Sequence, residues 1–161
     1  MRKGVYMYTN ELLAALGGAI IIGIVACLIY YILIVIAYWK IFNKAGEPGW
    51  KSIIPFLNIY TIYKIAWNGR MFWTIIGLDI AICVLSNSDN RVLMVIGALA
   101  GVASYVIGIM LDIKLAKAFG KGAGFAVGLI LLNPIFILIL AFGSSRYVGA
   151  DSDDQIYTNV V

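Results

Sequence analysis

Long apolar segments alternate with short charged stretches along this chain. The first segment, residues 12–38, contains no charged residue, and the next charge is Lys40. At about 1.5 Å per residue it is longer than the ~30 Å hydrocarbon core of a bilayer. A surface helix of a soluble domain would carry a polar stripe on one face, and this segment has none. The pattern therefore predicts a membrane protein whose first helix is retained rather than cleaved as a signal peptide.

The predicted fold class is all-α, a polytopic transmembrane helical bundle with four spans plus one interfacial or re-entrant helix. The four spans are expected at residues 11–42, 71–85, 92–118 and 125–142. Together they place the bundle at residues 1–142 and leave residues 143–161 as a flexible polar tail, because that end is rich in Asp, Ser and Gly.

Residues 50–67 are apolar but do not suit a crossing. Pro55, Asn58 and Lys64 interrupt the segment, and Trp50 and Trp67 bound it. Amphipathic aromatic rings settle at the headgroup level of a bilayer. Non-helical backbone at membrane depth is tolerated only where protein covers it. We therefore predict an interfacial or re-entrant helix here.

The basic residues support this topology. With four crossings, eight of them fall on one side of the membrane: Lys40, Lys44, Lys51, Lys64, Arg70, Lys114, Lys117 and Lys121. The other four fall on the opposite side: Arg2, Lys3, Arg91 and Arg146. By the positive-inside rule the larger group faces the cytoplasm, which places both termini outside.

Composition narrows the chemistry. The chain is 63% hydrophobic and 12% charged, with a net charge of +4 and no histidine. No clustered basic face is visible, so nucleic-acid binding is not expected. Without histidine, the commonest general base and metal ligand is missing, and Cys27 and Cys83 lie inside apolar segments. We predict no metal, no cofactor and no enzymatic activity.

Asp79 is the first candidate for a functional residue. It lies eight positions beyond Met71, about 12 Å into the membrane by helical rise. A lone carboxylate there is costly and is neutral or paired. It is either an ion or proton site or a polar contact that fixes helix register.

Other polar residues fall within or near the spans. Asp112 lies close to Lys114 and Lys117 and is either a satisfied interfacial charge or part of a site, and Lys64 is a natural partner for either aspartate. The hypothesis is that five residues converge on one polar pocket open to the cytoplasmic half: Asn58, Lys64, Asp79, Asp112 and Asn133.

Small residues recur at a spacing of four. The pairs are Gly97 and Gly101, Ser104 and Gly108, and Gly124 and Gly128. This spacing allows helix backbones to approach closely in lipid. The faces meet either within one chain or between chains, and intrachain packing is the default interpretation.

Two predicted cytoplasmic loops carry a family resemblance. One reads Lys44-Ala-Gly-Glu-Pro-Gly-Trp50 with Ile54-Pro55 after it, and the other reads Leu115-Ala-Lys-Ala-Phe-Gly-Lys-Gly122, followed by Asn133-Pro134. From about residue 38 to 143 the chain resembles an uncharacterised family of small bacterial multi-span membrane proteins, some of which carry the label signal peptidase I. The resemblance implies a bacterial inner-membrane location and supplies no catalytic residue. The Ser-x-x-x-x-Met-x-Pro signature of signal peptidases is missing from this sequence.

The Gly-Glu-Pro-Gly-Trp loop has two interpretations. Pro48 and its neighbouring glycines favour a tight turn, after which Trp50 anchors the next helix. Alternatively, the two loops form a recognition surface in which Glu47 contacts Lys117 or Lys121.

The predicted function is that of a structural or accessory membrane component, which resides in the lipid bilayer and binds a protein partner or a second copy of itself. The alternative is a small channel or transporter that uses the polar residues around Asp79.

Overall fold

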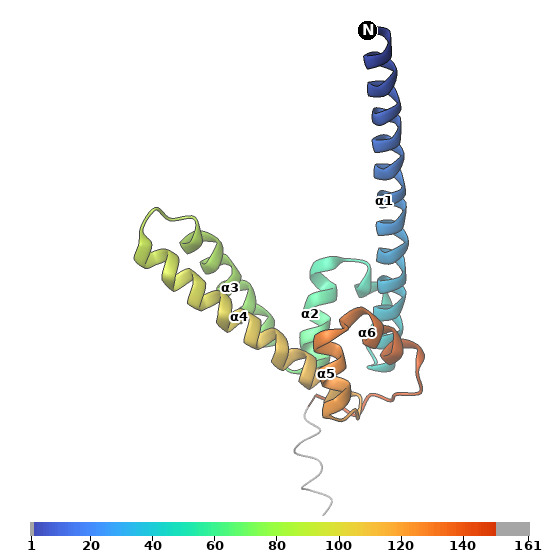
Figure 1. Ribbon diagram of the computed structural model, residues 1–161. Helices are drawn as coiled ribbons and strands as arrows, with labels where there is room; N and C mark the ends of the chain where they lie inside the picture. Colours follow the sequence, from blue (N-terminus) through green and yellow to red (C-terminus); the bar gives the residue numbers. More distant parts are fainter. Residues whose placement is uncertain (1, 151–161) are drawn as a thin grey trace, which may run out of the picture. The chain divides into compact units, whose positions relative to one another are not determined.

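In the part of the chain that its structure describes, every regular element is a helix. The computed structural model describes the backbone of residues 2–150 and the side chains of residues 15–150. The elements are α1 (Arg2–Lys44), a 3-10 helix η1 (Gly49–Ser52), α2 (Pro55–Ala66), α3 (Gly69–Ser86), α4 (Arg91–Ala118), α5 (Ala123–Leu131) and α6 (Asn133–Phe142) (Figure 1). This confirms the all-α class for the described residues.

The chain divides into two compact units, residues 1–35 and residues 36–161. The first unit is the N-terminal part of α1. Its apolar side chains are largely exposed, as shown by Ile22, which is 72% exposed. The second unit holds the end of α1 and all the other elements, and its described part ends at residue 150.

Within the described residues, three helices are long and apolar enough to cross a membrane: residues Ala15–Lys44 of α1, α3 and α4. They correspond to three of the four predicted spans, and α3 begins at Gly69, two residues before the predicted start. The short α2 covers most of the predicted interfacial segment and has 12 residues.

The fourth predicted span, residues 125–142, is not one helix in this structure. It divides into α5 and α6, of nine and ten residues, at Leu132 with φ −131° and ψ 47°. Pro134 explains the break, because it has no backbone N–H to donate to the Ile130 carbonyl and its ring would clash with that carbonyl in a continuous helix. Ten residues of helix extend about 15 Å, half of a hydrocarbon core, so neither helix crosses alone.

Close packing folds α5 and α6 against each other. A Cβ on Gly128 would collide with the ring of Phe136. The ring of Phe136 also meets that of Phe125 edge to face, with 5.1 Å between their centroids. The Gly124–Gly128 spacing therefore serves contact within the chain at Gly128, whereas a Cβ on Gly124 would meet nothing within 4 Å.

The main core lies where α1 and α4 end and α2, α5 and α6 meet them. Its fully buried large side chains include Ile41, Phe42, Phe119, Leu129 and Leu140. We call this the helix-end core. Small buried residues such as Ala116 and Ala141 let the helices approach within it.

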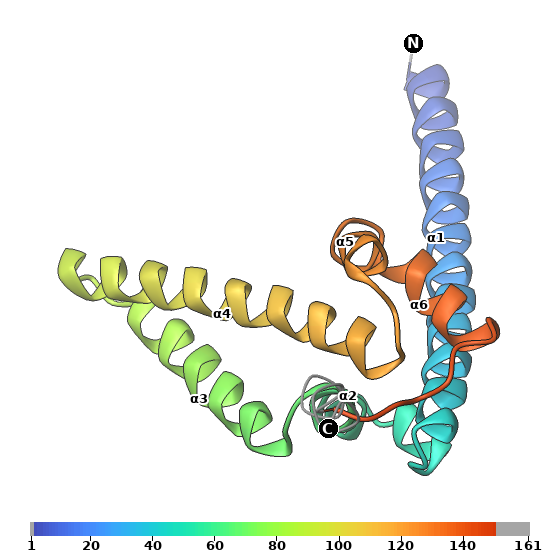
Figure 2. The same ribbon diagram turned by 90° about the horizontal axis from the view of Figure 1, so that it is seen from below.

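The α3 and α4 helices form an antiparallel pair joined by residues 87–90 (Figure 1). They diverge toward their other ends, where α2 contacts both (Figure 2). The buried Phe72 ring joins α3 to α2 through edge contacts with Phe56, Tyr60 and Tyr63. Gly97 lies close to Ser86 across the pair, so this glycine also serves contact within the chain.

Residues 143–148 were expected to begin a flexible tail, but they pack against the helix-end core. Ser145 is buried, the Tyr147 hydroxyl donates to the Ile65 carbonyl over 3.1 Å, and the Val148 amide donates to the Ala118 carbonyl over 2.8 Å. These bonds satisfy carbonyls at the ends of α2 and α4 that have no helical partner. The rest of the predicted tail, residues 151–161, lies outside the described residues.

Candidate functional site

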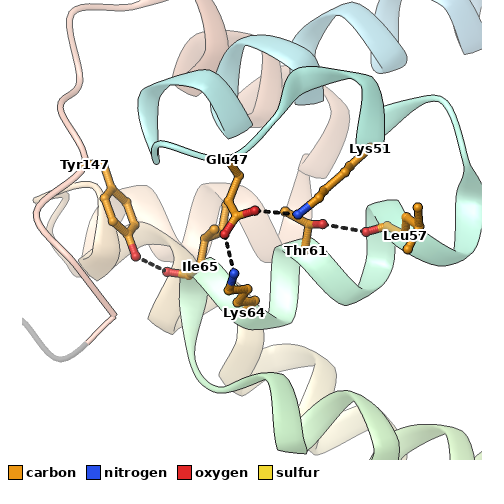
Figure 3. Close-up of polar contacts among 7 residues, drawn as sticks. All are labelled: Glu47, Lys51, Leu57, Thr61, Lys64, Ile65 and Tyr147. Carbon is orange, nitrogen blue, oxygen red and sulfur yellow. Dashed lines mark hydrogen bonds and ion pairs between the residues drawn. The ribbon is translucent and has the colours of Figure 1, made fainter.

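Glu47 ties the loop after α1 to α2. Its Oε2 accepts from the Lys51 ammonium and its Oε1 from the Lys64 ammonium, both over 2.6 Å (Figure 3). Burial of this carboxylate acts to raise its pKa, but the two lysine hydrogen bonds outweigh that effect and lower the pKa of Glu47. The same hydrogen bond from Lys64 to Glu47 raises the pKa of Lys64.

These pairs correct two expectations. Lys64 was considered the natural partner of either aspartate, and the alternative interpretation of the loop paired Glu47 with Lys117 or Lys121. Because the loop is short, Glu47 instead pairs with Lys51, in the turn after Pro48, and with Lys64, on the facing side of α2. The charges of this loop therefore hold the chain's own elements together.

The remaining candidate loop residues lie apart from Glu47. Trp50, in η1, is about half exposed, and a Cβ on its neighbour Gly49 would overlap the indole of Trp39. Lys117 and Lys121 line a separate cavity of about 240 Å³ at the start of α5. The Lys121 ammonium lies 5.8 Å from the centroid of the Phe125 ring.

Lys44 is a further positioning residue, which the sequence analysis did not single out. Its ammonium donates to the carbonyls of Leu140 and Gly143 over 2.7 and 2.8 Å. It thereby caps the C-terminal end of α6, where a positive charge also interacts favourably with the helix dipole. The only sequence feature that indicates this role is the position of Lys44 at the end of a long apolar run.

Asp112 and Asn133 are the two predicted site residues that the structure brings together. The Asn133 amide donates to the Asp112 carboxylate over 3.3 Å. Both line a cavity of about 420 Å³ between α4, α2, the end of α1 and the break between α5 and α6. Three tyrosines also line it: Tyr38, Tyr63 and Tyr105.

The spacing of the α4 residues explains this lining. Tyr105, Gly108 and Asp112 follow at intervals of three and four, which puts them on one face of a helix. That stripe is visible in the sequence, and it could have added Tyr105 to the predicted set. The contributions of Tyr38 and Tyr63 depend on how α1 and α2 fold over α4, which no local pattern indicates.

One acidic side chain, that of Asp112, lines the cavity. Burial raises the pKa of the Tyr63 phenol, and the charges of Asp79 and Asp112 raise it further. Among the described residues, no lysine or arginine forms an ion pair with Asp112. The nearby Lys114 instead lies over the Trp67 ring, 5.1 Å from its centroid.

Asp79 does not line this cavity. It accepts a hydrogen bond from the Ser104 hydroxyl over 2.9 Å, across the α3/α4 pair, and it is exposed. It lies ten residues after Gly69, about 15 Å along α3, close to the middle of this span. A carboxylate on the outer surface of a span is costly in lipid.

Asn58 is also separate from the cavity. Its amide donates to the Ser52 carbonyl over 3.4 Å, and its own carbonyl oxygen is buried without a described partner. The five predicted residues therefore form several local contacts rather than one pocket. Within the described part of the chain, no group of three His, Cys, Asp or Glu side chains is placed to hold a metal ion.

Comparison with known families now adds one finding. Residues 50–150 match the model of a family of unknown function, DUF5684. The chain belongs to this family. The match begins at Trp50 and includes α2 to α6, so it covers the α3/α4 pair and every lining residue of the cavity except Tyr38. No curated protein and no solved structure matches the chain.

Proposed function

We propose that this protein is a non-enzymatic, multi-pass component of the bacterial inner membrane, where it acts as a structural or accessory subunit. In this proposal it works by associating with a second copy of itself or with another membrane protein, through the outer face of α3 and α4. The observation that supports the proposal is the exposed carboxylate of Asp79 in the middle of α3.

A partner helix would remove the cost of this exposed group. The one described partner of the Asp79 carboxylate is the Ser104 hydroxyl. Lipid tails offer no hydrogen bonds, so polar groups in spans favour contact with another helix. A second copy is the simplest partner, because a twofold axis places two identical surfaces opposite each other.

We further propose three crossings, with α5 and α6 as a re-entrant pair. Residues 143–148 contact the same ends of α2 and α4 that carry the lysine-rich loops. Arg146 then joins the eight basic residues of that side, which makes nine against three: Arg2, Lys3 and Arg91. This distribution agrees better with the positive-inside rule than the four-crossing arrangement does, and it moves residues 143–150 to the cytoplasmic side.

Topology can be tested with cysteine labelling. A single cysteine introduced as Ser144→Cys, in a chain whose Cys27 and Cys83 are replaced by Ala, is expected to react only after the membrane is permeabilised. Labelling of intact cells by an impermeant reagent would instead support four crossings.

The association proposal is tested by the mass of the purified full chain in nanodiscs. We expect dimers or larger assemblies for the wild type, and a loss of about 5- to 30-fold in association constant for Asp79→Leu, since one interhelical hydrogen-bonding group is worth about 1–2 kcal/mol. Asp89→Leu, in the loop between α3 and α4, is the matched control. A monomeric wild type that co-purifies with no other membrane protein would contradict the proposal.

A second candidate function is a small channel or transporter. The observation that favours it is the cavity of about 420 Å³ lined by Asp112 and Asn133. Ion or proton flux into vesicles that contain the purified protein tests it, with Asp112→Asn and Asp79→Asn compared with the wild type. Flux that either change abolishes would favour transport over the accessory role, and no flux above empty vesicles would exclude it.

A further inference from the structure

The cavity beside Asp112 combines features that do not occur together elsewhere in the described residues. It holds a half-buried carboxylate, three tyrosines and an otherwise mostly apolar wall. Tyr63 is 5% exposed and Tyr105 is 70% exposed, so the tyrosines extend from the buried part of the wall to its open side.

The Asp112 carboxylate has no cationic partner among the described residues. The Asn133 amide is its one described hydrogen-bond partner, and both described ion pairs involve Glu47. A carboxylate that is partly removed from water favours a counter-ion, whether from the protein or from a ligand.

The residues that line the cavity favour organic cations over metal ions. A metal ion prefers several oxygen ligands, and this cavity offers one carboxylate and one amide among many apolar groups. Aromatic rings attract organic cations through the negative faces of their π-systems, and this attraction strengthens when water is removed. Apolar side chains such as Ile59 and Leu115 suit alkyl groups rather than a hydrated ion.

We propose that this cavity binds a small organic cation of the alkylammonium class, with Asp112 as its counter-ion and the tyrosines contacting its alkyl groups. The site concerns binding alone. It does not depend on the proposed association through α3 and α4, and it supplies a ligand class for the second candidate function. The ammonium can belong to a free solute or to a lipid headgroup, because both present the same chemistry.

The test uses the full chain in nanodiscs made of phosphatidylglycerol, which has no ammonium group. Choline and its uncharged analogue 3,3-dimethylbutanol are titrated by calorimetry. We expect choline to bind at least about tenfold more tightly than the neutral analogue, because the pair differs only in charge. Equal affinities, or no binding of choline, would overturn the proposal without any variant.

Matched variants assign the charge. Asp112→Asn is expected to reduce choline affinity at least about tenfold and to leave the neutral analogue unaffected. Asp79→Asn removes a carboxylate from the neighbouring helix, outside the cavity wall, and is expected to retain binding within about twofold. An equal loss in both variants would overturn the assignment to this cavity. Each variant's thermal unfolding is measured so that a folding defect is recognised.

Nanodiscs that contain phosphatidylethanolamine distinguish the source of the ligand. Weaker choline binding in these discs would show competition by the lipid ammonium and identify a headgroup site. Unchanged binding would identify a site for a free solute. Binding without flux in the vesicle experiment would leave this inference intact while excluding a transporter.

Discussion

The helix-end core and the outer part of the α3/α4 pair differ in how far their apolar side chains are exposed. In the helix-end core, Phe42, Phe119 and Leu129 are at most 2% exposed, and nearby charges are paired or cap helix ends. In the outer pair, Val84, Leu99 and Tyr105 are all more than 60% exposed, although both helices are highly apolar. In lipid such exposure costs little, so we infer that the first region determines the tertiary structure and the second depends on the bilayer or a partner.

The largest effect should come from truncating a large side chain of the helix-end core. Phe119→Ala is expected to destabilise the protein by about 3–5 kcal/mol, because it removes a buried ring that packs against other core residues. Leu99→Ala, in the outer pair, should cost only about 0.5 kcal/mol, as surface substitutions usually do. Chemical unfolding in nanodiscs measures both. Similar losses would show that the outer pair is also part of the stabilising core.

Two glycines of α5 allow a closely packed position and an open position to be compared within one helix. Gly128→Ala should destabilise the fold by about 1–3 kcal/mol, because the new Cβ must displace the Phe136 ring. Gly124→Ala meets no neighbour within 4 Å and should stabilise α5 by about 0.5–1 kcal/mol through helix propensity. The two changes in unfolding free energy should therefore have opposite signs. A loss at Gly124 would indicate that another chain packs there.

The ion pairs of Glu47 give a smaller effect with a defined pH dependence. Glu47→Gln should cost about 1–2 kcal/mol near neutral pH, a discounted value because Lys64 is half exposed. The pKa of Glu47 is lowered from 4.5 in the folded protein, so its contribution is present above about pH 4.5 and is lost as the pH falls through the folded value.

Lys64 sets the other limit of this window. Its pKa is raised from 10.5, so its contribution is lost only as the pH rises above that value. The difference in stability between wild type and Glu47→Gln should therefore be constant from about pH 5 to pH 10 and shrink on acidification. A difference that persists at pH 2 would mean that Glu47 acts through packing rather than charge.

Sequence predicted the helices better than their junctions. The helices α1, α3 and α4, which are long and apolar enough to cross a membrane, follow directly from long and mostly apolar runs. The break at Leu132 was not predicted, although Pro134 lies two residues after it, because residues 125–142 together have the length and hydropathy of a span. A proline is tolerated in some membrane helices, so the sequence alone does not show that α5 and α6 pack against each other, with Phe136 over Gly128.

The candidate site shows the same division. Asp112 and Asn133 were both recognised as polar residues at membrane depth, but their pairing depends on that unforeseen break, which brings Asn133 beside α4. The aspartate partner considered for Lys64 and the alternative pairing of Glu47 with Lys117 or Lys121 were wrong, because loop geometry decided between several lysines of equal charge.

The cap that Lys44 places on α6 has a consequence for biosynthesis. Its acceptors on Leu140 and Gly143 are 96 and 99 residues further along the chain. A ribosome therefore makes the ammonium group long before it makes the carbonyls that receive it, and the bundle closes only when residue 143 has been released from the exit tunnel. A nascent chain arrested before residue 143 would keep the Lys44 ammonium in water. It would also stay accessible to an insertase or a chaperone.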